Sequence, residues 1–270
     1  MIKYLSILRI NWIHALEYRA NALIGLFAIL SGLFIEYQIW SLIFDSNNSE
    51  IIMAGSSKAL TFQELIVFIF LSIIVGQLKS SWVTSSQMIL EIRQGLINKY
   101  LIRPISYFWY HFMMFVGVNS LYIMVYMSLL VAFVFIYPGI LFNSLISIIG
   151  FGISLLLSIY LSYCIYFIMV CFAFWFGEVR SIVLAYNLGM LMLSGQYIPI
   201  RLFPERALEI IRWTPLQYLV DFPVSTAVGL FSFNQWLYNF SFALLWCVLL
   251  TGISFIIYSK AISQYEAYGQ

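Results

Sequence analysis

Long apolar runs separated by short polar stretches dominate the pattern along this chain. A membrane-spanning helix needs about 20 consecutive, mostly apolar residues, and six runs fit this pattern. The expected spans are residues 21–44, 62–81, 109–136, 142–176, 180–196 and 235–258. The fourth run is too long for one helix that crosses the bilayer perpendicularly, so we expect it to tilt or to project into the cytosol. The pattern predicts an all-α polytopic membrane protein.

The first 20 residues follow a different, amphipathic pattern. Five apolar residues share one broad helical face, namely Leu5, Leu8, Trp12, Ala15 and Leu16. Lys3, His14 and Glu17 lie mostly opposite that face. We expect residues 1–20 to form a helix in the cytoplasmic membrane interface, and a charged lead-in to the first span is the alternative.

A polar segment, residues 82–107, separates the second and third expected spans. As one helix, its apolar side contains Ile89, Leu90, Ile92, Leu96, Ile97, Tyr100 and Leu101, and its polar side contains Glu91, Gln94 and Asn98. Arg93 falls inside the apolar arc, and Pro104 is expected to stop the helix before an aromatic-rich return to the membrane. The pattern predicts a cytoplasmic amphipathic helix. Such a helix either docks a soluble partner or holds the third span in place.

Residues 195–230 contain four of the six prolines in the chain. Pro204 is suited to start a short helix that ends near Arg212, and a second helical piece after Thr214 is expected to be broken by Pro223. We expect a pair of short helices that re-enter the outer leaflet between spans five and six. An ordinary external loop with one surface helix is the alternative.

The distribution of Lys and Arg predicts the orientation. With the N-terminus inside, nine of the 13 basic residues fall on the cytoplasmic side of the six expected spans. Because cytoplasmic loops are enriched in Lys and Arg, both termini are expected in the cytosol. The sequence therefore predicts a multi-pass protein of the cell membrane.

Composition supports the membrane class and excludes others. Hydrophobic residues make up 63% of the chain and charged residues 9%, against about 25% charged residues in soluble domains. The mean hydropathy is +0.96. A net charge of +2 leaves no strongly basic patch, so nucleic acid is not an expected partner. The three cysteines all lie in apolar runs without metal-ligand spacing, and we expect them to be small buried residues.

Sequence patterns typical of enzymes are missing. The chain has no phosphate-binding P-loop, no HExxH and no GxSxG, and its two histidines, His14 and His111, are far apart in the sequence. We therefore expect no catalytic residue, cofactor or metal in this chain. A transport role fits better than enzyme chemistry.

Four polar residues inside the expected spans are candidates for a translocation path: Glu36, Gln77, Asn187 and Gln196. A carboxylate is costly in the bilayer centre, so Glu36 should face protein or water. It either lines a substrate cavity or lies near the outer headgroups. The other three side chains either hold helices together or contact substrate.

Two stretches resemble the ABC type-2 transporter permeases, in the branch with viologen- and antibiotic-exporter membrane subunits. The first resemblance rests on Ile92, Arg93, Gly95, Leu101, Arg103 and Pro104. The second rests on Pro215, Tyr218, Phe222, Pro223 and Gly229. The resemblance implies that residues 1–270 form a single permease domain, with 82–107 as the segment that couples to an ATPase.

This resemblance also implies partners and a function. Such permeases pair with a second permease chain, identical or related, and with two cytosolic ATPase subunits, which bind the ATP and Mg. The expected coupling residues are Glu91, Arg93, Gln94, Gly95, Asn98, Arg103 and Pro104. The implied function is ATP-driven export of a hydrophobic or amphipathic substrate, such as a drug, a peptide or a lipid-like molecule. The alternatives are a polysaccharide or lipid-linked glycan exporter, a membrane-embedded lipid-modifying enzyme, and a non-transporting scaffold.

Overall fold

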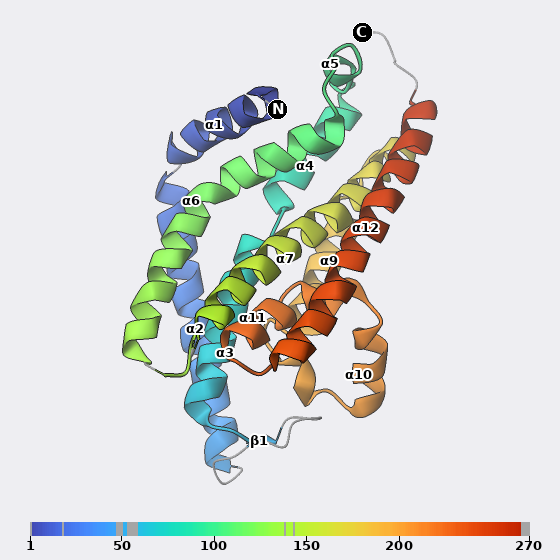
Figure 1. Cartoon of the computed structure of the whole chain (residues 1–270). Helices are drawn as coiled ribbons and strands as arrows, with labels where there is room; N and C mark the ends of the chain where they lie inside the picture. The colour runs from blue at the N-terminus through green and yellow to red at the C-terminus, as the bar shows by residue number, and fades with distance from the viewer. Residues whose placement is uncertain are drawn as a thin grey trace.

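The computed structural model describes residues 2–17, 19–46, 51–52, 59–137, 139–142 and 144–265 (Figure 1). Its helices are α1 (Ile2–Glu17), α2 (Arg19–Ser46), α3 (Phe62–Leu78), α4 (Trp82–Arg93), α5 (Asn98–Leu101), α6 (Tyr107–Ile136), α7 (Leu145–Cys171), α8 (Ala173–Phe176), α9 (Arg180–Leu193), α10 (Glu205–Arg212), α11 (Asp221–Ala227) and α12 (Phe233–Ser263). Two 3-10 turns, η1 (Ile200–Leu202) and η2 (Pro215–Tyr218), flank α10. The strands β1 (Ile51–Ile52) and β2 (Ala59–Leu60) pair antiparallel. Apart from that short pairing, the elements described are helical.

Five helical stretches of the described chain are long and apolar enough to cross a membrane. They are Ile24–Phe44, Phe62–Arg93, Tyr107–Ile136, Leu145–Phe176 and Phe233–Ser263. These stretches confirm five of the six expected spans. The remaining one, expected at 180–196, is α9, which has 14 residues and is about 21 Å long. That is shorter than the hydrocarbon core of about 30 Å, so α9 alone is not a full span.

The α3 helix forms the centre of the core. Thr61 and Glu64 make a capping box at its start, which satisfies backbone N–H groups that the first turn leaves free. Its side chains from Leu65 to Val75 are all buried, because α2, α6 and α11 pack around it. A helix that is apolar on all sides and covered by other helices is typical of a protein interior.

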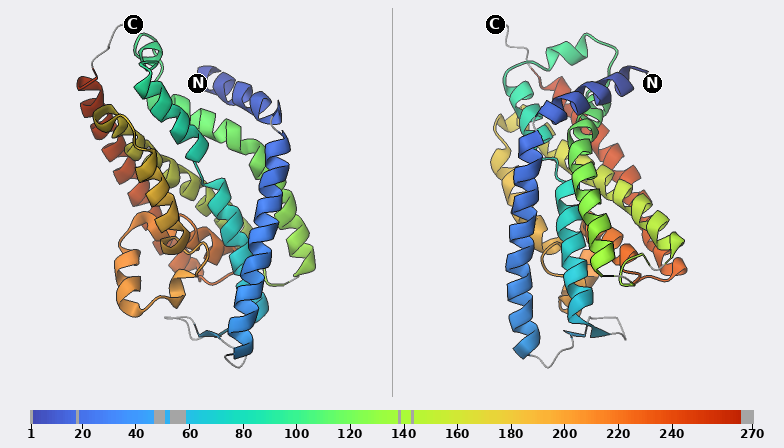
Figure 2. Two further views of the ribbon diagram at one scale, coloured as in Figure 1. Left: turned by 180° about the vertical axis from the view of Figure 1, so that it is seen from behind. Right: turned by 90° about the vertical axis from the view of Figure 1, so that its left-hand side faces the viewer.

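The polypeptide changes direction between α3 and α4. The Lys79 carbonyl there accepts a 2.8 Å hydrogen bond from Ser162 Oγ of α7. Because a buried carbonyl outside a helix needs a donor, this contact stabilises the break. Figure 2 shows α4 continuing from α3 toward the end of the molecule where α1 lies.

The α1 helix lies across the bundle and packs on α6 (Figures 1 and 2). Gly117 of α6 permits this approach, since a Cβ at Gly117 would lie 2.8 Å from the Asn11 Cβ and 2.9 Å from the Leu8 carbonyl oxygen. The expected apolar face is only partly correct. Ala15 is buried, but Leu5 and Leu16 are exposed. The amphipathic pattern therefore does not by itself identify the side that packs on α6.

The segment between α9 and α12 lies at the opposite end of the molecule from α1 (Figure 1). Every residue of α11 is buried, and α11 packs against α3 and α7. Ser158 Oγ of α7 donates to the Leu219 carbonyl, which anchors the approach to α11. The expected break at Pro223 is wrong, because Pro223 occupies the first turn of α11, where proline is tolerated.

Candidate functional site

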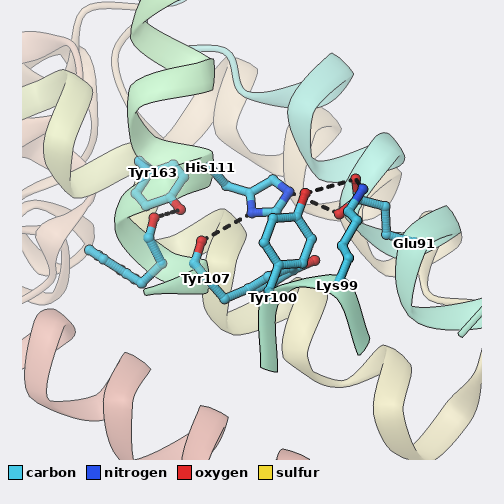
Figure 3. Close-up of polar contacts among 7 residues, drawn as sticks. Glu91, Lys99, Tyr100, Tyr107, His111 and Tyr163 are labelled. Carbon is cyan, nitrogen blue, oxygen red and sulfur yellow. Dashed lines mark hydrogen bonds and ion pairs between the residues drawn. The ribbon is translucent and has the colours of Figure 1, made fainter. Parts of the chain in front are cut away.

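Glu91 lies near the C-terminal end of α4 and points into the protein. Its side chain is 6% exposed. Oε2 lies 3.0 Å from His111 Nε2 of α6, and Oε1 accepts hydrogen bonds from Lys99 Nζ at 2.9 Å and Tyr100 Oη at 3.1 Å (Figure 3). One carboxylate thus joins α4, α5 and the first turns of α6.

His111 is fully buried and has an acceptor at each ring nitrogen. Its Nδ1 lies 3.0 Å from the Tyr107 carbonyl oxygen, and its Nε2 faces the Glu91 carboxylate (Figure 3). An imidazolium with two N–H groups satisfies both acceptors. The geometry therefore fits a buried ion pair between His111 and Glu91, which stays favourable only while both partners are present.

Tyr100 covers this ion pair from the side of α5. Its ring packs edge-on against Tyr107 and Tyr110, and Lys99 Nζ lies 4.7 Å from its centroid. Burial, together with the negative charge of Glu91, raises the pKa of Tyr100 well above its usual value. Tyr100 therefore remains a neutral hydrogen-bond donor to Glu91 in the physiological pH range.

A glycine turn follows α4 and is attached to two other parts of the chain. Gly95 has φ of +71°, a conformation that favours glycine. Tyr265, just after α12, donates from its hydroxyl to the Gly95 carbonyl at 3.1 Å. Arg93 pairs with Glu178 in the connection between α8 and α9. These contacts join the turn to distant helices.

The structure corrects the predicted helix in residues 82–107. The Gly95 turn interrupts it, and α5 ends at Leu101, before Pro104 is reached. Glu91, predicted on the exposed polar side, is buried. Leu96 and Leu101, predicted on the apolar side against the membrane, are each 47% exposed.

An exposed surface remains beyond the buried ion pair, which we call the docking patch. It consists of Gln94, Leu96, Asn98, Leu101, Ile102 and Arg103. Ile102 is 83% exposed. Apolar side chains grouped among polar ones on a surface are typical of binding sites. The patch contains three predicted coupling residues, Gln94, Asn98 and Arg103. Glu91, another predicted coupling residue, is buried beneath it. Pro104, a further predicted coupling residue, is exposed beside it.

Sequence reasoning did not identify His111 as the partner of Glu91. A usable signal was present, because an ionisable residue inside an apolar helix needs a counter-charge. Glu91 is the acidic residue nearest to His111 in the sequence. The separation of 20 residues between the two hid the pairing from a reading based on a single helix.

The four translocation candidates do not form one cavity. Glu36 lines a cavity of about 570 Å³ between α2 and α9 and accepts a 3.0 Å hydrogen bond from Trp40 Nε1. Asn187 accepts from the Tyr166 hydroxyl. Gln196 is buried directly over Gly76, and Gln77 is exposed. Of the four, Glu36 lines this cavity.

The sequence also pointed to three cysteines and a second histidine. Cys164, Cys171 and Cys247 are buried free thiols. In the described residues, no group of three or more His, Cys, Asp or Glu side chains is arranged to hold a metal ion. His14 is exposed and lies 3.4 Å from a Glu17 oxygen.

Comparison with known proteins identifies the family. No curated protein is similar enough in sequence to match this chain. The sequence profile of the family described as "ABC-2 family transporter protein" matches residues 30–269, a range that includes four of the five long apolar stretches completely and part of the first. This chain therefore belongs to the ABC-2 family of transporter membrane proteins.

Proposed function

We propose that this chain is the permease subunit of an ATP-driven exporter that moves a hydrophobic or amphipathic substrate out of the cell. Membership of this family implies that the chain has an ABC ATPase as its partner. In this proposal, ATP and Mg bind to that partner. The observation that carries the proposal is the docking patch. It is exposed at one end of the bundle, and a buried ion pair fixes its base.

Charge supports a cytoplasmic position for the docking patch. Arg93, Lys99 and Arg103 lie in or beside it, and positive residues favour the cytoplasmic side. The start of α1 and the end of α12 lie at the same end of the molecule (Figure 1). In the proposed orientation, both termini therefore face the cytosol.

Three contacts would transmit movement from the docking patch to the membrane helices. Glu91–His111 connects it to α6, and Tyr265–Gly95 connects it to α12. The Ser106 N–H donates to Tyr4 Oη at 3.3 Å, which links the segment to α1. A partner ATPase that displaces the patch would therefore act on α1, α6 and α12 together.

The cavity beside Glu36 is the proposed translocation path. It opens between α2 and α9, and two of its apolar lining residues, Ile39 of α2 and Leu188 of α9, are 47% and 59% exposed. A second permease chain, identical or related, would close this side and complete the path. In the proposal, α9 and the residues after it together provide the sixth crossing.

Negative charges introduced on the docking patch should release the ATPase. We expect the double variant Asn98→Glu/Arg103→Glu to reduce the amount of co-purified ATPase by about tenfold or more, because misplaced charges at an interface cost several kcal/mol. The measurement is a pull-down of the tagged chain from its native membrane in mild detergent, followed by mass spectrometry.

Lys260→Glu provides a matched control for this pull-down. Lys260 is exposed near the end of α12 but lies outside the docking patch, so this charge reversal should leave the ATPase bound. If an ATPase co-purifies equally with the native chain and the double variant, the patch is not its docking site. If none co-purifies even with the native chain, the exporter proposal loses its support.

Glu36→Gln tests the translocation path. The amide keeps the shape and can still accept from Trp40, so we expect a stability change of roughly 0.6 kcal/mol or less. Loss of the charge should nevertheless reduce efflux of ethidium, measured in cells that contain the assembled complex. Trp40→Phe, which removes the hydrogen bond but leaves the carboxylate, is the control. Native efflux by Glu36→Gln would remove Glu36 from the path.

A further inference from the structure

A second cavity, of about 750 Å³, lies at the end of the molecule opposite the docking patch. It is formed by η1, α10, η2, the start of α11 and the first turns of α12. Figure 1 shows α10 and this end of α12 side by side, away from the chain termini. Its charged and amide side chains are Arg201, Arg212, Gln217, Asp221, Asn234, Gln235 and Asn239. The polar lining differs from the apolar cavity beside Glu36.

Asp221 provides a buried negative group in this cavity. It begins α11 and is 7% exposed. Oδ2 accepts a 3.4 Å hydrogen bond from Ser225 Oγ, whereas Oδ1 has no hydrogen-bond partner within the described part of the chain. A buried acceptor without a donor is unfavourable. A ligand with an N–H group would satisfy it.

Two arginines provide positive groups around the same space. Arg201 lies over the Phe231 ring, 5.0 Å from its centroid, and Arg212 ends α10. Burial raises the pKa of Asp221, and the positive charge of Arg201 opposes that increase. The structure records no ion pair of either guanidinium with a described acid. Both arginines line the cavity. The cavity therefore contains positive guanidinium groups and a carboxylate that one ligand can contact together.

The mouth of the cavity carries exposed aromatic side chains. Trp213 is 76% exposed and Tyr238 is 64% exposed, and both line the cavity. Trp and Tyr are enriched where membrane proteins meet the headgroup region. Leu245 and Val248, farther along α12, are 50% and 62% exposed. This apolar surface provides a place for an acyl chain, which favours a lipid over a soluble ligand.

We propose that this cavity binds the headgroup of a zwitterionic phospholipid with a primary ammonium group, such as phosphatidylethanolamine. The ammonium donates to Asp221 Oδ1, and the phosphate pairs with Arg201 and Arg212. Arg–phosphate pairs of this kind are strong and directional. A choline headgroup cannot replace this ligand, because its quaternary nitrogen carries no N–H. The inference is independent of which substrate the transporter exports.

Lipid retention by the purified full-length chain tests the proposal. The chain in detergent is mixed with phosphatidylethanolamine, phosphatidylcholine or phosphatidylglycerol with identical acyl chains, and bound lipid is counted by native mass spectrometry. We expect phosphatidylethanolamine to be retained about tenfold more than phosphatidylcholine, since a hydrogen bond to a charged group has an effect of this size. Asp221→Asn should abolish that preference.

Arg206→Gln is the matched control, because Arg206 lies on α10, is exposed and does not line the cavity. It should keep the native preference. If Asp221→Asn does not fold, as judged by its thermal unfolding without lipid, Arg201→Gln serves as the second variant and should retain less phosphatidylethanolamine than the native chain.

Three results would overturn the proposal. One is equal retention of the ethanolamine and choline lipids by the native chain. Another is an unchanged lipid preference in a folded Asp221→Asn variant, or native retention of phosphatidylethanolamine by a folded Arg201→Gln variant. The third is a rise in Tm with soluble phosphoethanolamine that is as large as the rise with the phospholipid. That result would show that the ligand need not be a lipid. None of these measurements requires the ATPase, so they are separate from the test of the exporter function.

Discussion

Replacing Glu91 by leucine should lower the free energy of unfolding by about 3–5 kcal/mol, the usual effect of removing one partner from a buried ion pair. His111 would remain fully buried without its counter-charge, and Tyr100 Oη would lose its acceptor. We expect Tm in detergent to fall by roughly 10 °C, measured by thermal unfolding of the purified chain.

Arg93→Leu is the control for Glu91→Leu, two residues along the same helix. Arg93 also forms an ion pair, with Glu178, but their side chains are 46% and 43% exposed. Exposed pairs contribute about 0–1 kcal/mol, so this variant should unfold close to the native temperature. Equal Tm values for the two variants would contradict the buried ion pair.

A double variant separates the ion pair from simple loss of packing. Glu91→Leu/His111→Leu removes both charges, and replacing both partners by apolar groups costs much less than leaving one unpaired. Its loss of stability should therefore be smaller than the sum of the two single losses. Additive losses would show that Glu91 and His111 do not stabilise each other.

Gly117→Ala should weaken the packing of α1 on α6. The new Cβ would meet the Leu8 carbonyl oxygen at 2.9 Å, and a backbone atom cannot move aside as the end of a flexible side chain can. Overpacking of this kind costs about 1–3 kcal/mol. We expect faster hydrogen exchange in the α1 amides and a lower Tm.

Gly252→Ala is the matched glycine substitution. Gly252 lies in the interior of α12, and a Cβ there has no atom within 4 Å. Removing glycine from an unobstructed helix position stabilises the helix by roughly 0.5–1 kcal/mol. The two variants should therefore change Tm in opposite directions. Native exchange rates in α1 of Gly117→Ala would show that Gly117 is not required for this helix contact.

Where an apolar run is long, the sequence predicts the ends of the spanning helix to within a few residues. The third was expected at 109–136 and is Tyr107–Ile136, and the last was expected at 235–258 and is Phe233–Ser263. The last helix extends past its apolar run to Ser263, because polar residues can continue the backbone hydrogen bonds of a helix. The run 180–196 was misleading, since its helix ends at Leu193, shortly before Gly195 with its φ of +83°.

Residues 82–107 show why a helical wheel was insufficient. The wheel assumed one continuous helix, but the Gly95 turn changes the direction in which all later side chains point. Leu96 and Leu101 therefore face outward. The sequence predicted several residues of the docking patch, but the turn at Gly95 decides which side chains in this segment are accessible.

The sequence by itself determined the membrane class, the five long helices and the resemblance to ABC type-2 permeases, because hydropathy and short motifs depend on neighbouring residues. Only the tertiary structure decided which polar groups meet. Glu91 pairs with His111 across 20 residues, and Tyr265 reaches Gly95 across 170. Such contacts depend on how helices cross and where turns rotate their faces. Periodicity along a single helix does not contain that information, because it reports which side is apolar and not which distant element covers it.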